Sequence, residues 1–340
     1  MNKPKEIKDF KDFFIQWHIT DKCNLKCKHC YGEYGDVECE ELSFNECINL
    51  IEQYVEWTKE WELTPWIHFT GGEPFMRKDF FDILAYANQL GVKIRILTNG
   101  TSLSKSVVEK LVANNVKSIS VGFDRLNETE FDEFRAKKGA YNKIIEGIRL
   151  LKEANIRVVL GPTINKENKN ELIDIFELAD SLEVDEFHIH RLVMQGRGEQ
   201  LNDLKLSSQE CKSIYETLFL EKDKFKNTKL SINGTLWPVI DDFKGMGGCI
   251  AGYSGMAVLT NGDVLACRLL PMPVGNVKKQ NLKDIYLNSE VMINCRERNL
   301  KGHCGNCDYK NACGGCRAVA FDSTGDYLEF DDQCWINERN

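Results

Sequence analysis

The chain has 340 residues, of which 42% are apolar and 28% charged, and its formal net charge at pH 7 is -8. This length suits one large domain accompanied by a smaller one. The negative balance disfavours nucleic acid and anionic membrane surfaces as partners, and no run approaches the roughly eighteen apolar residues of a membrane span. The first residues, MNKPKEIKDFKDFF, contain no apolar secretion signal, which predicts a cytoplasmic protein.

Along the first 200 residues, short β-branched or aromatic runs alternate with longer helical patterns. The predicted strands are Phe14–Ile19, Trp66–Phe69, Val92–Leu97, Ser118–Val121, Ile156–Leu160 and Phe187–His190. The predicted helices are Phe44–Trp61, Phe80–Leu90, Lys105–Ala113, Tyr141–Ala154 and Leu172–Leu182. This alternation requires parallel strands with outer helices, so we predict an α/β fold. In it, residues 14–200 form a partial (β/α)6 barrel after an N-terminal extension of residues 1–13.

A change of composition near residue 240 predicts a second domain. Eight cysteines lie between Gly245 and Asn340, with glycine-rich turns and without the βα alternation. A segment so poor in long apolar runs needs staples, and without export these are expected to be metal centres. We predict a small cysteine-rich α+β domain at residues 241–340, after a linking helix and strand region at residues 201–240.

Three cysteines directly after the first predicted strand form the most specific motif. Cys23, Cys27 and Cys30 have the spacing C-x3-C-x2-C, and no fourth cysteine lies nearby at comparable spacing. Zinc sites usually combine two ligand pairs, which this spacing fits poorly, and the missing secretion signal disfavours disulfides. Three thiolates can hold one corner of an iron–sulfur cube and leave one iron open to a ligand that the protein does not supply.

Two further motifs follow successive predicted strands. The run GGEP at residues 71–74 follows the second strand, where glycines let the backbone approach a ligand closely and Pro74 restricts the turn. The run TNG at residues 98–100 ends the third strand. Each run alone could be an ordinary turn. In this order after consecutive strands, they indicate one site at the C-terminal ends of the strands.

Together these motifs resemble those of radical S-adenosylmethionine (SAM) enzymes with a C-terminal SPASM domain, a cysteine-rich iron–sulfur domain. The resemblance spans nearly the whole chain and includes Gly262, placed so that Gly-x4-Cys ends at Cys267. It implies a [4Fe–4S] cluster on the cysteine triplet whose open iron binds SAM. It also implies cleavage of SAM to methionine and a 5′-deoxyadenosyl radical, which abstracts hydrogen from a substrate. The protein would hold SAM, exclude water and direct the radical.

The resemblance further implies which residues contact SAM. The GGEP run would meet its amino group, His29 would lie beside the adenine, and Arg135 would bind its carboxylate unless it forms a local surface salt bridge instead. Ser120 is expected to replace a serine that relatives often carry where this chain has Gly122. The expected cofactor-binding residues are His29, Gly71, Gly72, Glu73, Pro74, Asn99, Ser120 and Arg135.

For the C-terminal domain, the resemblance implies two auxiliary iron–sulfur clusters. The expected ligands are Cys304, Cys307, Cys313 and Cys334 for one, and Cys249, Cys267 and Cys316 for the other. The second set has an open or non-cysteine fourth place. Cys295 could fill it, although its helical surroundings favour a buried apolar role, which is also expected for Cys39, Cys47 and Cys211.

The substrate is the point on which the sequence leaves alternatives open. The leading interpretation is a ribosomally made precursor peptide that receives a thioether or carbon–carbon crosslink. A separate protein or the barrel surface would recognise any leader, and a low-potential flavodoxin or ferredoxin would supply electrons. One alternative is decarboxylation or trimming of tetrapyrrole propionates in haem biosynthesis, because the segment 191–198 resembles that of such enzymes, although the same segment occurs widely in SPASM enzymes. Another is side-chain oxidation as in sulfatase maturases, which carry an aspartate where this chain has Arg268.

Several residues leave the choice of substrate undecided. Arg191, Arg197 and Arg268 could pair with propionates or with acidic peptide side chains. A redox carrier would need only the C-terminal cysteines, and the complete SAM motifs argue against it. No carboxylate pair or His/Asp arrangement identifies an acid or base, so the sequence predicts no catalytic residue.

Overall fold

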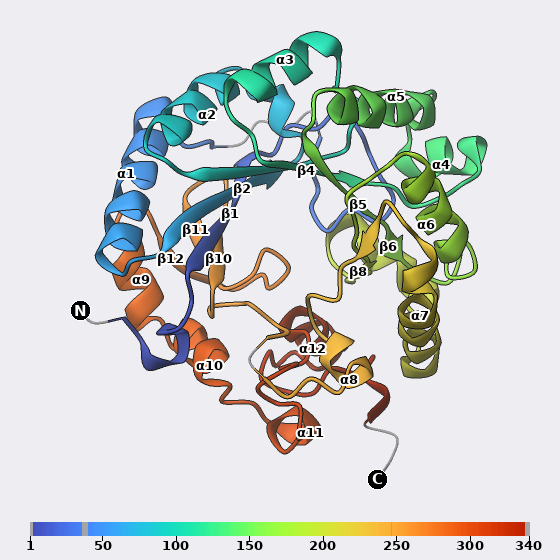
Figure 1. The fold of residues 1–340 in the computed structure, drawn as a ribbon. Coiled ribbons are helices and arrows are strands. Elements are labelled where there is room, and N and C mark those ends of the chain that lie inside the picture. Colours follow the sequence, from blue (N-terminus) through green and yellow to red (C-terminus); the bar gives the residue numbers. More distant parts are fainter. Residues whose placement is uncertain (1–2, 36–39, 246, 337–340) are drawn as a thin grey trace.

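The computed structural model describes residues 3–35, 40–245 and 247–336. Within them, the main sheet has ten strands in the order β12-β11-β10-β1-β2-β3-β4-β5-β7-β9 (Figure 1). Strands from β10 to β9 pair in parallel, whereas β11 and β12 are antiparallel additions at one edge. The sheet curves inside a ring of helices, as the α/β prediction requires.

The elements have the following bounds. The strands are β1 (Asp12–Thr20), β2 (Thr64–Gly71), β3 (Lys93–Thr98), β4 (Ser118–Gly122), β5 (Arg157–Gly161), β6 (Thr163–Ile164), β7 (Glu186–Phe187), β8 (His190–Arg191), β9 (Lys229–Leu230), β10 (Gly255–Val258), β11 (Asp263–Leu265) and β12 (Pro273–Asn276). The α-helices are α1 (Phe44–Glu60), α2 (Phe80–Gln89), α3 (Lys105–Ala113), α4 (Glu128–Arg135), α5 (Ala140–Glu153), α6 (Leu172–Ser181), α7 (Ser208–Glu221), α8 (Trp237–Ile240), α9 (Leu282–Asn288), α10 (Glu290–Glu297), α11 (Gly302–Gly305) and α12 (Arg317–Thr324). Short 3-10 helices are η1 (Lys5–Ile7), η2 (Pro74–Met76), η3 (Gly196–Leu204) and η4 (Lys222–Lys224).

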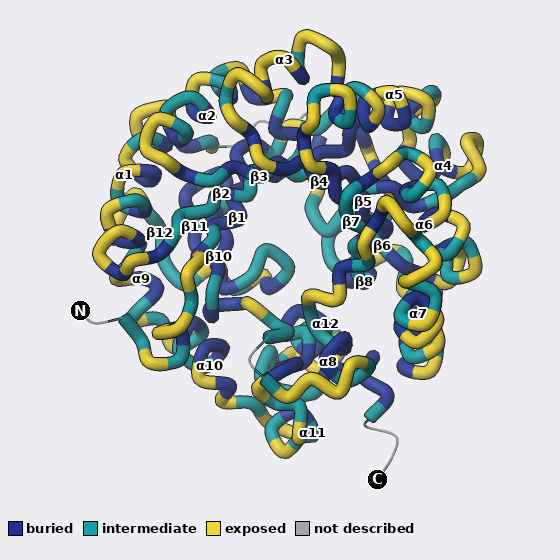
Figure 2. Tube along the Cα trace, viewed as in Figure 1, coloured by how far each residue is buried: buried dark blue, intermediate teal, exposed yellow. Residues whose placement is uncertain are grey.

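The alternation along β1 separates the core from the barrel interior. Phe13 and Trp17 are fully buried, and the ring of Phe13 lies 4.9 Å from that of Trp57 on α1. The next residue after Trp17, His18, points the other way, and its Nδ1 lies 2.9 Å from the Tyr34 hydroxyl on the loop after β1. Figure 2 shows the consequence, with dark blue strands inside and exposed yellow turns on the outer helices. Period-two strands therefore place polar side chains in the interior.

Two elements differ from the sequence expectation. The sixth predicted strand is divided between β7 and β8, and β8 pairs with β6 in a separate two-stranded sheet. Helix α4 has no predicted counterpart, because only Phe131 and Phe134 form its short apolar stripe. Its N-cap is Asn127, whose side chain accepts hydrogen bonds from the Thr129 and Glu130 amides.

The cysteine-rich segment is joined closely to the barrel. Strand β10 pairs in parallel with β1, so β10 to β12 continue the barrel's own sheet. The remaining segment, with α8, α11 and α12, lies between α10 and α7, where the ring lacks outer helices (Figure 1). The domain boundaries at residues 13, 200 and 240 remain predictions. No helix in the described part of the chain is both long and apolar enough to cross a membrane.

Candidate active site

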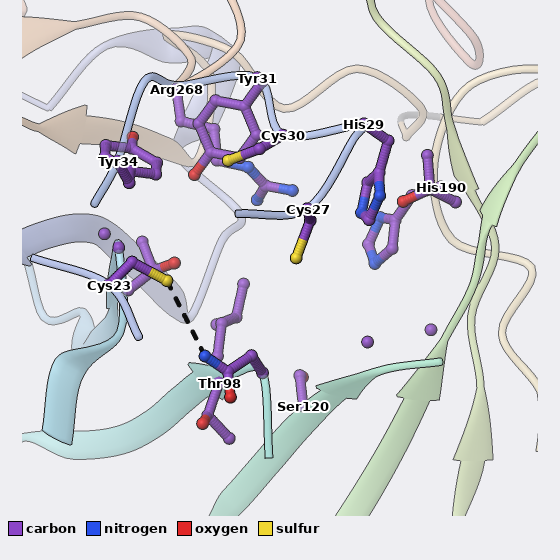
Figure 3. A pocket seen from close by; sticks show the side chains of 18 of the residues that line it. Cys23, Cys27, His29, Cys30, Tyr31, Tyr34, Thr98, Ser120, His190 and Arg268 are labelled. Carbon is purple, nitrogen blue, oxygen red and sulfur yellow. Dashed lines mark hydrogen bonds between the residues drawn. The ribbon is translucent and has the colours of Figure 1, made fainter. Parts of the chain in front are cut away.

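The three motif cysteines lie on the loop after β1, and their thiols point into one space (Figure 3). Distant segments hold this loop in place. The Lys28 amide donates to the Phe134 carbonyl at 3.0 Å. Arg197 donates from Nε to the Cys27 carbonyl and from Nη1 to the Tyr34 carbonyl, both at 2.9 Å. The loop is therefore fixed by contacts from α4 and from the segment after β8.

A cavity opens beside this loop at the C-terminal ends of the parallel strands. It encloses about 1140 Å³ of space, including solvent at its mouth. Its wall contains most of the residues that the sequence placed together, namely Cys23, Cys27, His29, Cys30, Gly71, Gly72, Asn99, Ser120 and Arg135. Residues from four strand ends thus meet at one site, as parallel strands require.

Gly71 and Gly72 pass directly against the cysteine loop. A Cβ atom on Gly71 would lie 2.2 Å from the Thr20 carbonyl oxygen, and one on Gly72 would lie 2.3 Å from that of Lys22. The φ angle of Gly71 is also 128°, a conformation that favours glycine. The glycines are therefore required for the close approach between the two motifs.

Glu73 joins the ends of β2 and β3. Its buried carboxylate accepts hydrogen bonds from the Thr98 hydroxyl at 2.8 Å and from the Asn99 amide at 2.9 Å. Burial raises the pKa of Glu73 to about 7, and these hydrogen bonds oppose the rise. Within the described structure, neither Glu73 nor Pro74 belongs to the cavity wall. Their contact with SAM therefore stays a prediction, and the contacts of Glu73 are those of a positioning residue.

Asn99 connects the third strand to the cysteine loop. Its Nδ2 donates to Asn24 Oδ1 at 2.8 Å and lies 3.9 Å from Cys23 Sγ, while its Oδ1 accepts from the Thr101 amide at 3.0 Å. Asn99 thus braces the loop as well as lining the cavity.

Arg135 forms a buried ion pair with Asp124, a residue that the sequence did not single out. The distance from Arg135 Nη2 to Asp124 Oδ2 is 2.5 Å, and Arg135 Nη1 donates to Cys27 Sγ at 3.8 Å. This placement excludes the surface salt bridge considered for Arg135. Burial alone would raise the pKa of Asp124, but Arg135 lowers it below its usual value. A Cβ on Gly122 would lie 2.7 Å from Arg135 Nη2, so glycine there leaves room for the guanidinium.

His29 presents a neutral imidazole to the same cavity. Its ring stacks on Phe134 with 4.8 Å between centroids and 5° between planes, and its Nε2 lies 3.9 Å from Asp124 Oδ2. Burial lowers the pKa of His29 to about 4, with a smaller opposing effect from Asp124. An uncharged, already stacked ring suits a contact with an aromatic base.

A second polar group inside the barrel was missed by the sequence analysis. His18 lies 2.9 Å from the Tyr34 hydroxyl and 3.4 Å from the Tyr31 hydroxyl. Burial, followed by the nearby Arg268, lowers the pKa of His18 to about 3. The available signal was its alternation with Trp17 and Ile19, which directs it toward the interior.

The downstream cysteine set gathers around one small cavity lined by Cys304, Cys307, Cys313 and Cys334. Arg317 lies beside it, and its buried Nη2 has no oxygen or nitrogen partner among the described residues. A Cβ on Gly315 would lie 2.5 Å from this Nη2 and 2.9 Å from Cys304 Sγ. Four thiols around a space, with an unpaired N–H group at its edge, fit a four-cysteine cluster whose sulfur accepts that hydrogen.

The upstream set also comes together, and Cys295 lies close to it. Burial first, and then Cys249 and Cys316, raise the pKa of Cys267 to about 12. Cys295 on α10 is fully buried as expected, and burial first, then Cys249 and more weakly Cys267, raise its pKa to about 12. Cys295 therefore remains a candidate for the fourth ligand.

The remaining cysteines fit the apolar expectation where they are described. Cys47 and Cys211 are fully buried in the hydrophobic core, whereas Cys39 lies outside the described residues. In the described ranges, no three His, Cys, Asp or Glu side chains converge on a point that would hold a single ion.

Comparison with known proteins agrees with this arrangement. Residues 17–179 match the Radical SAM superfamily, and residues 249–316 match SPASM, described as an iron–sulfur cluster-binding domain. The chain is 32% identical over 342 residues to the AdoMet-dependent heme synthase of Methanosarcina barkeri, covering 94% of this chain and 95% of that protein. It is 26% identical over 321 residues to the mycofactocin maturase MftC of Mycolicibacterium smegmatis, covering 90% and 78%.

A solved structure shows the same fold. The crystal structure of Streptococcus suis SuiB bound to S-adenosylmethionine has a TM-score of 0.76 at 18% identity, covering 95% of this chain and 77% of that one. The motifs, the cavity at the strand ends and the two matched families lead to one conclusion: the chain belongs to the radical SAM superfamily of enzymes, in the group that carries a C-terminal SPASM iron–sulfur domain.

Proposed function

We propose that the chain uses radical SAM chemistry to decarboxylate or trim propionate side chains of a tetrapyrrole in haem synthesis. The observation that carries this proposal is the near full-length similarity, at 32% identity, to an AdoMet-dependent heme synthase. The mycofactocin maturase is less similar, at 26% identity. The tetrapyrrole hypothesis therefore replaces the peptide hypothesis, which the sequence analysis had placed first.

The charges of the cavity wall support an anionic substrate. Four arginines line it, namely Arg135, Arg191, Arg197 and Arg268, and the described wall residues include no aspartate or glutamate. Asp124 and Asp331 pair with Arg135 and Arg191 from behind the wall, so its excess positive charge comes from Arg197 and Arg268. Guanidinium groups pair well with carboxylates, which are the groups that a propionate-bearing tetrapyrrole would bring into the cavity.

The described residues would hold the cofactors as follows. Cys23, Cys27 and Cys30 would bind a [4Fe–4S] cluster, and the residues proposed around SAM are His29, Gly71, Gly72, Asn99, Ser120 and Arg135. Cluster and SAM together would supply the radical that removes a substrate hydrogen. The chain itself fixes the cysteine loop through Arg197 and Asn99, and it keeps His29 neutral by burial. Two auxiliary clusters and a flavodoxin or ferredoxin as electron donor belong to the same proposal.

A second candidate is modification of a ribosomally made peptide. The similarity to the mycofactocin maturase over 90% of this chain favours it. The substrates differ in their products, so one assay can separate the two functions.

The test is mass spectrometry of the reaction products. We would incubate reconstituted enzyme with SAM, a reductant and iron-coproporphyrin III, a tetrapyrrole with four propionate groups. The expected product has lost one carbon dioxide and two hydrogen atoms for each propionate converted to a vinyl group. Formation of 5′-deoxyadenosine with an unchanged porphyrin mass would refute the proposal. In a parallel reaction, a candidate peptide that loses two hydrogen atoms would support the second function instead.

A further inference from the structure

We propose that Arg268 binds a carboxylate of the substrate, an assignment that rests on the proposed function and extends it. Arg268 directly follows Cys267 and lines the same cavity as the cysteine loop. The sequence left Arg191, Arg197 and Arg268 as equal candidates for pairing with propionates. Their contacts in the structure now distinguish them.

Arg191 already has a carboxylate partner. It donates from Nη1 to Asp331 Oδ1 at 2.9 Å and from Nη2 to Asp331 Oδ2 at 2.7 Å. Its Nη2 also donates to the Thr235 hydroxyl at 2.8 Å. A guanidinium whose two terminal nitrogens both donate to one carboxylate is not available to a substrate.

Arg197 and Arg135 are also engaged. Arg197 donates to the backbone carbonyls of Cys27 and Tyr34, which are part of the cysteine loop. Arg135 is paired with Asp124. Arg197 holds the cysteine loop, and Arg135, whose charge is matched by Asp124, is the residue proposed beside SAM, which leaves Arg268 as the remaining arginine of the described cavity wall.

Arg268 has no such partner among the described residues. Its Nε is buried without a hydrogen bond, and its guanidinium carbon lies 5.5 Å from the centroid of the Tyr31 ring. Figure 3 shows the guanidinium directed into the cavity from the side of Tyr31 and Cys30. A buried guanidinium donor without a partner is costly, so a ligand carboxylate would satisfy it.

The histidine side chains near Arg268 are uncharged. Burial first, and then Arg268, lower the pKa of His18 to about 3. Burial is also the main cause of the low pKa of His68, followed by Arg95, and of His190, followed by His188, and Arg268 adds a smaller effect at both. These imidazoles are therefore neutral near pH 7. They can surround an uncharged macrocycle, while the carboxylate it carries pairs with Arg268 in the cavity wall.

The carboxylate of SAM is the competing ligand, and position separates the two. Arg135 comes from α4 and contacts Cys27 of the cysteine loop. Arg268 comes from the segment after β11, next to Cys267 of the upstream auxiliary set. The assignment therefore places the substrate carboxylate between the cysteine loop and the upstream set.

The first experiment compares native enzyme with R268Q and R268K in the reconstituted, anaerobic protein. The affinity for coproporphyrin III is measured by fluorescence titration, and SAM affinity is measured separately. We expect R268Q to weaken porphyrin binding about tenfold to a hundredfold, and R268K to weaken it less, because the charge remains without the planar fork. SAM affinity should change less than about twofold.

Controls separate charge recognition from misfolding. The tetramethyl ester of coproporphyrin III should bind native enzyme and R268Q equally. R149Q changes an arginine on α5 with a side chain that is 61% exposed, and it should leave porphyrin affinity unchanged. Equal porphyrin affinity in R268Q and native enzyme would overturn the assignment. The assignment would also be overturned if R268Q lost as much affinity for SAM as for porphyrin, because Arg268 would then bind the carboxylate of SAM.

A second experiment does not depend on the tetrapyrrole. Phenylglyoxal modifies accessible arginines, and peptide mass spectrometry quantifies the adduct on Arg268. Sodium propionate should slow this reaction, whereas propionamide, which has the same shape without the charge, should not. Absence of protection by propionate would overturn the carboxylate site whatever the porphyrin results. Protection by propionate in an enzyme that binds no porphyrin would refute the proposed function alone.

Discussion

Arg191 and Asp331 join the barrel to the cysteine-rich segment by a doubly hydrogen-bonded ion pair across 140 positions of sequence. Their side chains are 6% and 0% exposed. Asp331 Oδ2 also accepts a hydrogen bond from the Cys316 amide at 2.7 Å. One carboxylate therefore fixes β8 relative to an expected ligand of the upstream auxiliary cluster.

Replacing Asp331 by asparagine should destabilise the protein strongly. The variant D331N leaves Arg191 buried without its counter-charge, which typically costs about 3–5 kcal/mol. Urea unfolding should detect this loss. The adjacent D332N is the matched control, since Asp332 is 33% exposed and pairs with Lys205 at 2.8 Å, so it should cost less than about 1 kcal/mol. Equal losses in the two variants would contradict a special role of the buried pair.

The same pair predicts a loss of stability in acid. Burial alone would raise the pKa of Asp331, but Arg191 brings it below the usual value of 3.8. The folded state therefore favours the ionised carboxylate. Its contribution is fully present above the usual pKa and disappears as the pH falls through the lowered one. D331N should lack this component when unfolding is followed between neutral pH and pH 3.

The iron content should fall when the three loop cysteines are replaced, but not when a core cysteine is replaced. Replacing Cys23, Cys27 and Cys30 by alanine should remove about four irons per chain and abolish SAM cleavage, because a [4Fe–4S] cluster loses all its protein ligands. Cys211→Ala changes a fully buried cysteine of the hydrophobic core and should keep all iron. Colorimetric iron analysis and 5′-deoxyadenosine formation are the measurements. SAM cleavage by the triple variant would exclude the loop as the cluster site.

Replacing Gly122 by alanine should displace the Arg135 side chain. In G122A the new Cβ would lie 2.7 Å from Arg135 Nη2, in a pair that is almost completely buried, so the guanidinium must move. We expect a loss of about 1–3 kcal/mol in stability and weaker SAM binding. In the control G35A, the Cβ meets no described atom within 4 Å, and binding should be unaffected. Unchanged SAM affinity in G122A would separate Arg135 from the SAM site.

The contribution of Glu73 to folding stability should depend on pH in the opposite direction to that of Asp331. Its pKa is raised by burial from the usual 4.5 to about 7, so the folded protein holds the proton more tightly than the unfolded chain. Its contribution to stability therefore falls as the pH rises from about 4.5 to about 7 and then stays level. E73Q keeps a neutral group of the same shape.

The difference in unfolding free energy between E73Q and native protein should accordingly shift by about 1 kcal/mol in favour of E73Q between pH 6 and pH 8. Urea unfolding at the two pH values measures it. A difference that stays constant would mean that Glu73 does not titrate in this range.

Local sequence patterns were sufficient for the barrel and for the position of its site. The strand expected at Phe14–Ile19 lies within β1, and the helix expected at Phe44–Trp61 matches α1 within one residue. Apolar periodicity is a local property, so it can be read without the fold. The cysteine loop and the glycines of the GGEP run meet at the cavity because parallel strands bring their C-terminal ends to one edge.

The sequence by itself therefore determined the superfamily, the barrel and the loop that carries the three cysteines, since these depend on short motifs and their order. Only the tertiary structure decided which arginine of the described cavity wall has no protein partner, that Asp124 faces Arg135, and that Cys295 approaches the upstream cysteines. The same holds for the parallel pairing of β10 with β1. The physical reason is that an ion pair or a strand pairing depends on the partner's position in space. Residues as far apart as Arg191 and Asp331 leave no trace of such a contact in either local pattern.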